Sequence, residues 1–170
     1  MNNKEKILRE LYLNPTYKFH LRELSRKTKL NPNTILNITD KLKEQGFIIK
    51  QKHKNIVEIF LNIENPDLIF RKKLFNLFQI HESGIIPVLI KEFSPKSISL
   101  IGSYSRGEDI EKSDIDIVII SENNKLINLS KFEKKLNRRI HLLTAEKEKM
   151  SKEFLNNLIN GIVLYGAIKL

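Results

Sequence analysis

The sequence predicts an α+β protein of two compact units joined by a short linking helix. Apolar spacing is helical up to about residue 45 and then changes to the two-residue period of strands over residues 47–61. A seam at Pro66 follows, and from residue 85 onward helical stretches alternate with short apolar strands. We therefore expect an N-terminal unit, a linking helix and a C-terminal unit at residues 1–64, 65–84 and 85–170.

The charge and the composition limit which classes of partner and which kinds of site the chain can have. The 170 residues carry 30 Lys and Arg against 20 Asp and Glu, a formal net charge of +10. Residues 1–65 hold +6 of it, which favours a polyanionic partner for that part of the chain. The absence of cysteine excludes disulfides and thiolate metal sites. No apolar run reaches the ~18 residues of a membrane span, and residues 1–10 lack a hydrophobic signal core, so we expect a cytoplasmic chain with no membrane partner.

Three helices are expected in the N-terminal unit. Residues 3–13 and about 20–28 space their apolar side chains helically. Asn31 and Pro32 then mark the start of a third helix, because Asn caps the free amides of a first turn and Pro fits the first helical position. Gly46 ends this helix as a left-handed cap.

A basic hairpin is expected after the third helix. Residues 47–49 and 56–61 have the composition of strands, and the connecting residues 50–55 (KQKHKN) form a basic tip. Within the third helix, Ile35, Ile38 and Leu42 recur at helical spacing and should face the core. The opposite face of that helix is therefore polar.

This order of three helices and a basic hairpin over residues 1–62 resembles the winged helix-turn-helix domain of small prokaryotic transcription regulators. The resemblance implies that double-stranded DNA is a partner, with the third helix in the major groove and the hairpin on phosphates or a minor groove. Such proteins commonly pair to match two half-sites, so a homodimer is expected. The expected DNA-binding residues are Asn33, Thr34, Asn37 and Lys41 on the helix and Lys50, Lys52, His53 and Lys54 on the hairpin. The alternative is that these are ordinary solvated side chains.

The linking region is expected to be helical. Residues 67–81 carry apolar side chains on more than one face, and Phe70, Phe75 and Phe78 are expected in a core or an interface, a dimer interface included. A second helix is expected over residues 85–93.

A polar motif between two apolar strands is the most informative part of the chain. Residues 97–101 form one expected strand, which ends at Gly102-Ser103, and residues 114–120 form the next. Ten residues lie between Ser103 and Asp114, in a polar loop that contains Arg106. The motif is therefore Gly-Ser, ten residues, Asp-x-Asp.

Each part of the motif has a chemical reason. Side chains two apart on a strand share a face, so Asp114 and Asp116 are expected to meet at one divalent cation. Carboxylate oxygens suit Mg²⁺ held between a protein and nucleotide phosphates. Gly102 allows a phosphate close to the backbone, Ser103 offers a hydroxyl and an amide, and Arg106 adds a charged donor.

The motif resembles the minimal nucleotidyltransferase domain of the DNA polymerase beta superfamily, over about residues 85–170 and including the closing stretch 161–166. The resemblance implies a mixed sheet flanked by helices, a nucleoside triphosphate such as ATP, and Mg²⁺ or Mn²⁺. It assigns Asp114 and Asp116 as catalytic metal ligands, and Gly102 and Ser103 as nucleotide contacts.

One position departs from the family pattern. Active members use a third carboxylate on a later strand, here expected at residues 139–144 after a helix at 125–138, and His141 occupies that position. The nearest acidic residue downstream is Glu146. A histidine accepts a proton or binds a softer metal, but it adds no negative charge to hold Mg²⁺. The alternative is a strand histidine packed beside the site.

These observations lead to three hypotheses. The preferred one is a DNA-binding transcription regulator whose second domain binds Mg-nucleotide, with catalysis in question because of His141. The alternative is an active Mg²⁺-dependent enzyme that transfers AMP to a protein or small molecule, similar to the antitoxins that modify HEPN-type toxins. The third is a protein-interaction module.

Overall fold

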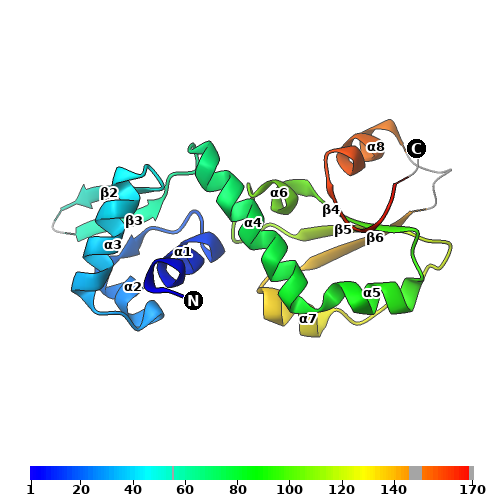
Figure 1. Cartoon of the computed structure of the whole chain (residues 1–170), viewed down its shortest axis with the longest axis horizontal. Helices are drawn as coiled ribbons and strands as arrows, with labels where there is room; N and C mark the ends of the chain where they lie inside the picture. The colour runs from blue at the N-terminus through cyan, green and yellow to red at the C-terminus, as the bar shows by residue number, and fades with distance from the viewer. Residues whose placement is uncertain (55, 146–150, 169–170) are drawn as a thin grey trace. The chain divides into compact units, whose positions relative to one another are not determined.

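Two compact units make up the protein. The computed structural model describes residues 1–54, 56–145 and 151–168 (Figure 1), and the chain divides into Met1–Lys72 and Lys73–Leu170. The boundary falls within helix α4, Pro66–Ser83. Each unit has its own sheet. Among the helices of the described residues, none combines the length and the apolar character that crossing a membrane requires.

The N-terminal unit combines three helices with a small antiparallel sheet of strand order β1-β3-β2. Its elements before α4 are α1 (Asn3–Leu13), β1 (Phe19–His20), α2 (Leu21–Thr28), α3 (Pro32–Glu44), β2 (Ile48–His53) and β3 (Ile56–Leu61).

The expected start and end of α3 are confirmed. The Asn31 side chain accepts a hydrogen bond from the Asn33 amide (2.8 Å), and Pro32 is the first helical residue. Gly46 adopts φ +72° directly after the C-cap. On the inner face of α3, Ile35 and Leu42 are buried as expected, but Ile38 is only half-buried. Thr39 is buried there instead, and its hydroxyl is satisfied inside the core because it donates to the Ile35 carbonyl (2.8 Å).

Two boundaries in this unit differ from expectation. His20 belongs to β1 and caps α2, so α2 begins one residue later. Strand β2 begins at Ile48 and continues to His53, since its pairing with β3 runs without a break to His53 opposite Ile56. Most of the expected basic tip is therefore strand, and Asn55 lies outside the described residues.

The C-terminal unit is built on a mixed sheet of strand order β6-β5-β4-β7, in which β5 and β6 are parallel and the other pairs antiparallel. This confirms the α+β class and the expected mixed sheet with helices. The elements after α4 are α5 (Ile85–Phe93), β4 (Ser97–Ile101), α6 (Gly102–Arg106), β5 (Ile115–Ile120), α7 (Ser130–Leu136), β6 (Ile140–Ala145), α8 (Lys152–Ile159) and β7 (Ile162–Gly166).

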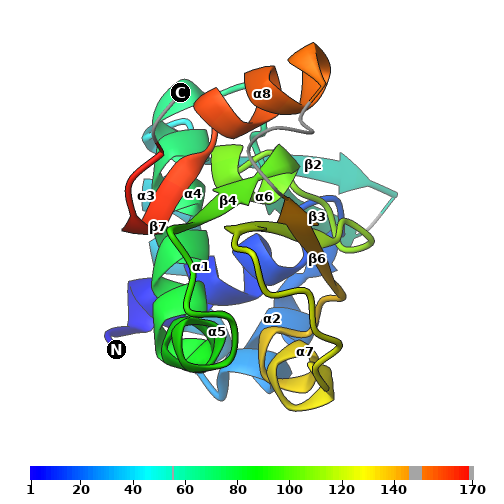
Figure 2. The same cartoon turned by 90° about the vertical axis from the view of Figure 1, so that its right-hand side faces the viewer.

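Helices cover both faces of this sheet. Figure 2 shows α5 and α7 on one side of the strands and α8 on the other. Strand β5 alternates between the two: Ile117 packs in the cluster with α5 and α7, and Val118 packs with Leu158 of α8. Asp116, one residue before Ile117, therefore projects on the α8 side.

Three expectations about this unit need correction. The loop after Ser103 begins as the short helix α6 rather than as an open loop. Helix α7 is confined to Ser130–Leu136, well short of the expected 125–138. Asp114 lies immediately before β5 and not within it, because strand pairing begins at Ile115, whose amide donates to the Arg139 carbonyl (2.8 Å). Glu146 lies outside the described residues.

Candidate functional site

Gly102 and Asp116 meet at the end of β4. The antiparallel register pairs Ile101 with Asp116, so the chain turns away from the sheet directly beside this carboxylate. Gly102 adopts φ +73°, and a Cβ added to it would lie 2.5 Å from Asp116 Oδ2. The Ser105 hydroxyl donates to the Gly102 carbonyl (2.8 Å) and holds the turn. Only a residue without a side chain fits this backbone against this carboxylate.

His141 lies on the other side of Asp116. Strands β5 and β6 are parallel with Asp116 opposite His141, so both side chains project on the same face. His141 Nδ1 and Asp116 Oδ1 are 3.2 Å apart. The side chains are 59% and 31% exposed, so the pair is open to solvent.

The other expected residues are distributed around this pair. Ser103 is half-buried, and its carbonyl accepts from the Glu108 amide (3.0 Å). Arg106 forms an exposed ion pair with Glu108, with Nε and Oε2 2.7 Å apart. Asp114 is exposed and borders an open hollow of about 630 Å³, whose basic lining includes Lys112, Lys134 and Arg139. The structure thus brings Gly102 and Asp116 together, whereas Asp114 and Arg106 are exposed residues just before β5 and at the end of α6.

Comparisons with known proteins identify the family of the C-terminal unit. Residues 82–165 match the nucleotidyltransferase domain family, a region that contains Gly102, Asp114, Asp116 and His141. A putative protein adenylyltransferase of Methanocaldococcus jannaschii is 32% identical over 85 residues, which cover 46% of this chain and 83% of that protein. The chain belongs to the nucleotidyltransferase domain family. The matched region lies within the C-terminal unit.

A buried polar group anchors the loop of the nucleotidyltransferase domain between α6 and β5. Asp109 is 2% exposed, and Asn76 of α4 donates both to its Oδ1 (2.7 Å) and to the Tyr104 carbonyl (2.9 Å). Arg138 Nη2 lies 3.9 Å from Asp109 Oδ2. Burial raises the pKa of Tyr104 well above its ordinary value, and the Asp109 charge adds to the rise. Sequence reasoning missed this group, because the pattern of the loop residues does not indicate that Asp109 is buried.

The residues at the Gly102 turn fit a divalent cation bound with a nucleotide. Such domains generally use a nucleoside triphosphate and a divalent metal. Asp116 offers carboxylate oxygen, and its Oδ2 lies so close to the Gly102 backbone that a Cβ at this position would be only 2.5 Å from it. Within the described part of the chain, no group of three or more His, Asp and Glu side chains is placed to hold a metal. Mg²⁺ bound with a nucleotide generally takes one or two carboxylates from the protein and its other ligands from phosphates and water.

A second candidate surface lies on the N-terminal unit. An open hollow of about 1050 Å³ lies among α2, α3 and the β2–β3 hairpin. Its lining includes Arg22 and Arg26 of α2, two basic residues that were not among the expected DNA contacts. Of the expected α3 contacts, Thr34 is half-buried, and the exposed ones are Asn33, Asn37 and Lys41.

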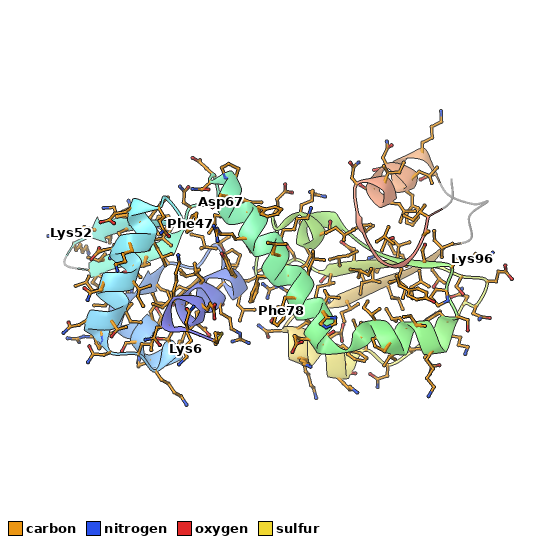
Figure 3. All side chains as sticks on the ribbon, in the orientation of Figure 1. Lys6, Phe47, Lys52, Asp67, Phe78 and Lys96 are labelled. Carbon is orange, nitrogen blue, oxygen red and sulfur yellow. The ribbon has the colours of Figure 1, made fainter. Side chains whose placement is uncertain are left out.

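The basic residues of the hairpin differ in how exposed their side chains are. The Lys50 ammonium pairs with Asp40 of α3 at 2.6 Å, and the Lys50 side chain is only 9% exposed. Lys52, His53 and Lys54 are exposed. Figure 3 shows Lys52 projecting from the outer end of the hairpin.

Proposed function

We propose that the nucleotidyltransferase domain binds ATP with a divalent cation and transfers AMP to a hydroxyl group of a protein. The observation that carries the proposal is the contact between Gly102 and Asp116, which combines a carboxylate with backbone free of a side chain. The choice of AMP and of a protein acceptor rests on the likeness to the putative protein adenylyltransferase. The toxin partner of an antitoxin would be one such acceptor.

The chemistry needs few protein groups. The acceptor oxygen forms a bond to the α-phosphorus, the bond from that phosphorus to pyrophosphate breaks, and pyrophosphate leaves with the electron pair. The hydroxyl proton passes to water, which reaches the exposed site. Asp116, together with the exposed Asp114, would hold a cation such as Mg²⁺ or Mn²⁺, which would offset charge on the phosphates. Ser103 and Arg106 orient the triphosphate, and the Arg106–Glu108 pair is exposed and weak enough to exchange for phosphate.

Transfer of label from ATP tests the proposal. The full chain is incubated with [α-³²P]ATP, Mg²⁺ or Mn²⁺, and a lysate of the host, and labelled protein is separated by electrophoresis. We expect a labelled protein band that disappears with Asp116→Asn. Label from [γ-³²P]ATP should not transfer, because pyrophosphate is the leaving group. Transfer of the γ-label, or no transfer with either cation, would contradict an AMP transferase.

We further infer that the N-terminal unit is a winged helix-turn-helix domain that binds double-stranded DNA. The net charge of +6 over residues 1–65, the exposed Asn33 and Asn37 on α3, and the exposed Lys52 on the hairpin support this. Fluorescence anisotropy with labelled duplexes at increasing salt tests it. We expect affinity to fall steeply with salt, because phosphate contacts release counterions. An absence of duplex binding at low salt would refute the inference.

We also propose that α4 pairs with the α4 of a second copy. Phe70, Leu74 and Phe78 recur every four residues, and each is at least half exposed. Antiparallel pairing centred on Leu74 would place Asp67 of one protomer opposite His81 of its partner, which are complementary charges when the imidazole is protonated. Phe78→Ser should then shift the chain to monomer in sedimentation velocity, while a matched change elsewhere, Ile159→Ser, should not. Identical sedimentation of Phe78→Ser and the parent dimer, or a parent that is already monomeric, would contradict the pairing.

A further inference from the structure

His141 and Asp116 are side-chain neighbours that come from two different strands. The two residues are register partners on parallel strands, so their backbones hold the side chains next to each other on one face. Oδ2 of Asp116 faces Gly102, and Oδ1 faces His141 Nδ1. One carboxylate thus joins the glycine turn to the imidazole.

The separation of the two atoms matches the spacing of metal ligands. Neighbouring ligands of an octahedral cation, each about 2.1 Å from the ion, are about 3.0 Å apart. Asp116 Oδ1 and His141 Nδ1 are 3.2 Å apart, so one cation reaches both with small side-chain adjustments. The imidazole is 59% exposed, which leaves the cation open to phosphates and water.

We propose that Asp116 and His141 together ligate the divalent cation of the nucleotide complex, and that the imidazole makes this site favour Mn²⁺ over Mg²⁺. The inference rests on the proposed nucleotide-binding function of the same site. Imidazole nitrogen binds transition metals well, whereas Mg²⁺ prefers oxygen ligands and retains its water. An imidazole ligand also brings no negative charge, unlike a carboxylate ligand, and this weakens the binding of Mg²⁺ more than the binding of a metal that gains a nitrogen bond.

Asp114 has a lesser part in this arrangement. It is exposed, lies before β5 and borders a hollow with basic residues, and no three-residue metal group is present among residues 1–54, 56–145 and 151–168. The side chains best placed to ligate the cation are therefore those of Asp116 and His141. The triphosphate and water supply the rest of the coordination shell.

Pulsed electron paramagnetic resonance on the Mn²⁺ complex tests the inference. The full chain is loaded with Mn²⁺ and α,β-methylene-ATP, which does not release pyrophosphate, and electron spin-echo modulation reports nitrogen bound to Mn²⁺. We expect an imidazole nitrogen coupling in the parent that is absent in His141→Ala. His20→Ala, which removes an exposed histidine of the N-terminal unit, should retain the coupling.

Affinity measurements give a second readout. Titration of Mn²⁺ and Mg²⁺ in the presence of the same analogue should show that His141→Ala weakens Mn²⁺ binding by ~10-fold or more. His141→Asp should bind Mg²⁺ more tightly than the parent does, so the ratio of Mn²⁺ to Mg²⁺ affinity should fall. Circular dichroism checks that each variant is folded, and the nitrogen coupling of the parent needs no variant at all.

The outcomes separate this inference from the proposed function. A parent complex without nitrogen coupling, or an unchanged affinity ratio in His141→Asp, overturns the role of His141. If AMP transfer to a protein is still observed, the function stands and only the ligand assignment fails. If the analogue binds with neither cation, both the ligand assignment and the proposed function are refuted.

Discussion

The close approach of Gly102 to Asp116 predicts a specific defect in Gly102→Ala. A Cβ at this position would lie 2.5 Å from Oδ2, whereas ordinary contacts begin near 3.4 Å. The carboxylate must therefore retreat by about 1 Å. A displacement of that size at a reacting centre lowers a rate by up to ~100-fold. We expect a reduction of that order in AMP transfer.

Gly84→Ala is a matched control for the backbone term. Gly84 adopts φ +77°, close to the φ +73° of Gly102, and no atom lies within 4 Å of its added Cβ. Both variants place alanine in the left-handed region, which costs about 1–2 kcal/mol. For a domain of this size, each kcal/mol lowers the melting temperature by roughly 4–8 °C. Gly84→Ala should therefore show the thermal shift but normal nucleotide binding and transfer.

Three measurements on the two variants decide the matter. Thermal unfolding followed by circular dichroism gives the stability change, calorimetry gives binding of α,β-methylene-ATP with the cation, and label transfer gives the rate. We expect the two variants to show similar changes in stability but to differ in nucleotide binding and in the rate of transfer. Equal binding and equal transfer in Gly102→Ala and Gly84→Ala would refute the idea that nucleotide binding and transfer require the close approach of Gly102 to Asp116.

Two further predictions concern the hairpin and the buried polar group. The double variant Lys52→Ala, Lys54→Ala should have a smaller slope of log affinity for duplex DNA against log salt, by about one unit for each phosphate interaction that is removed. Lys96→Ala in the other unit should leave this slope unchanged. An unaltered slope in the double variant would show that the hairpin does not contact the DNA. Asp109→Ala should lower the free energy of unfolding, measured by urea denaturation, by about 3 kcal/mol, because it leaves the Arg138 charge buried without this carboxylate. A change below about 1 kcal/mol would show that the buried group contributes little to stability.

Apolar spacing located several helices and strands well. Helices over residues 3–13 and 85–93 and strands over 56–61 and 97–101 have the bounds that apolar spacing predicted. Apolar spacing located them because their apolar side chains point into a core, on both faces in the case of β4. Helix α6 was missed because its five residues, Gly102–Arg106, are too few to show a period.

The candidate site was only partly predictable. The Gly-Ser and Asp-x-Asp spacing indicated a nucleotide site, and the family match at residues 82–165 agrees with it. The position of Asp114 was not predictable, because alternation applies within a strand and β5 begins one residue later. The pairing of Lys50 with Asp40 was likewise hidden, since it joins two elements that pack through the tertiary fold.

By itself, the sequence determined which chemical groups are available: a glycine at a turn, a carboxylate on a strand and an imidazole on a later one. Local propensities and spacing carry that information because they depend on neighbours along the chain. Only the tertiary structure decided that Asp116 lies between Gly102 and His141. That arrangement depends on the antiparallel register of β4 with β5 and the parallel register of β5 with β6, which pair residues 15 and 25 positions apart in the chain.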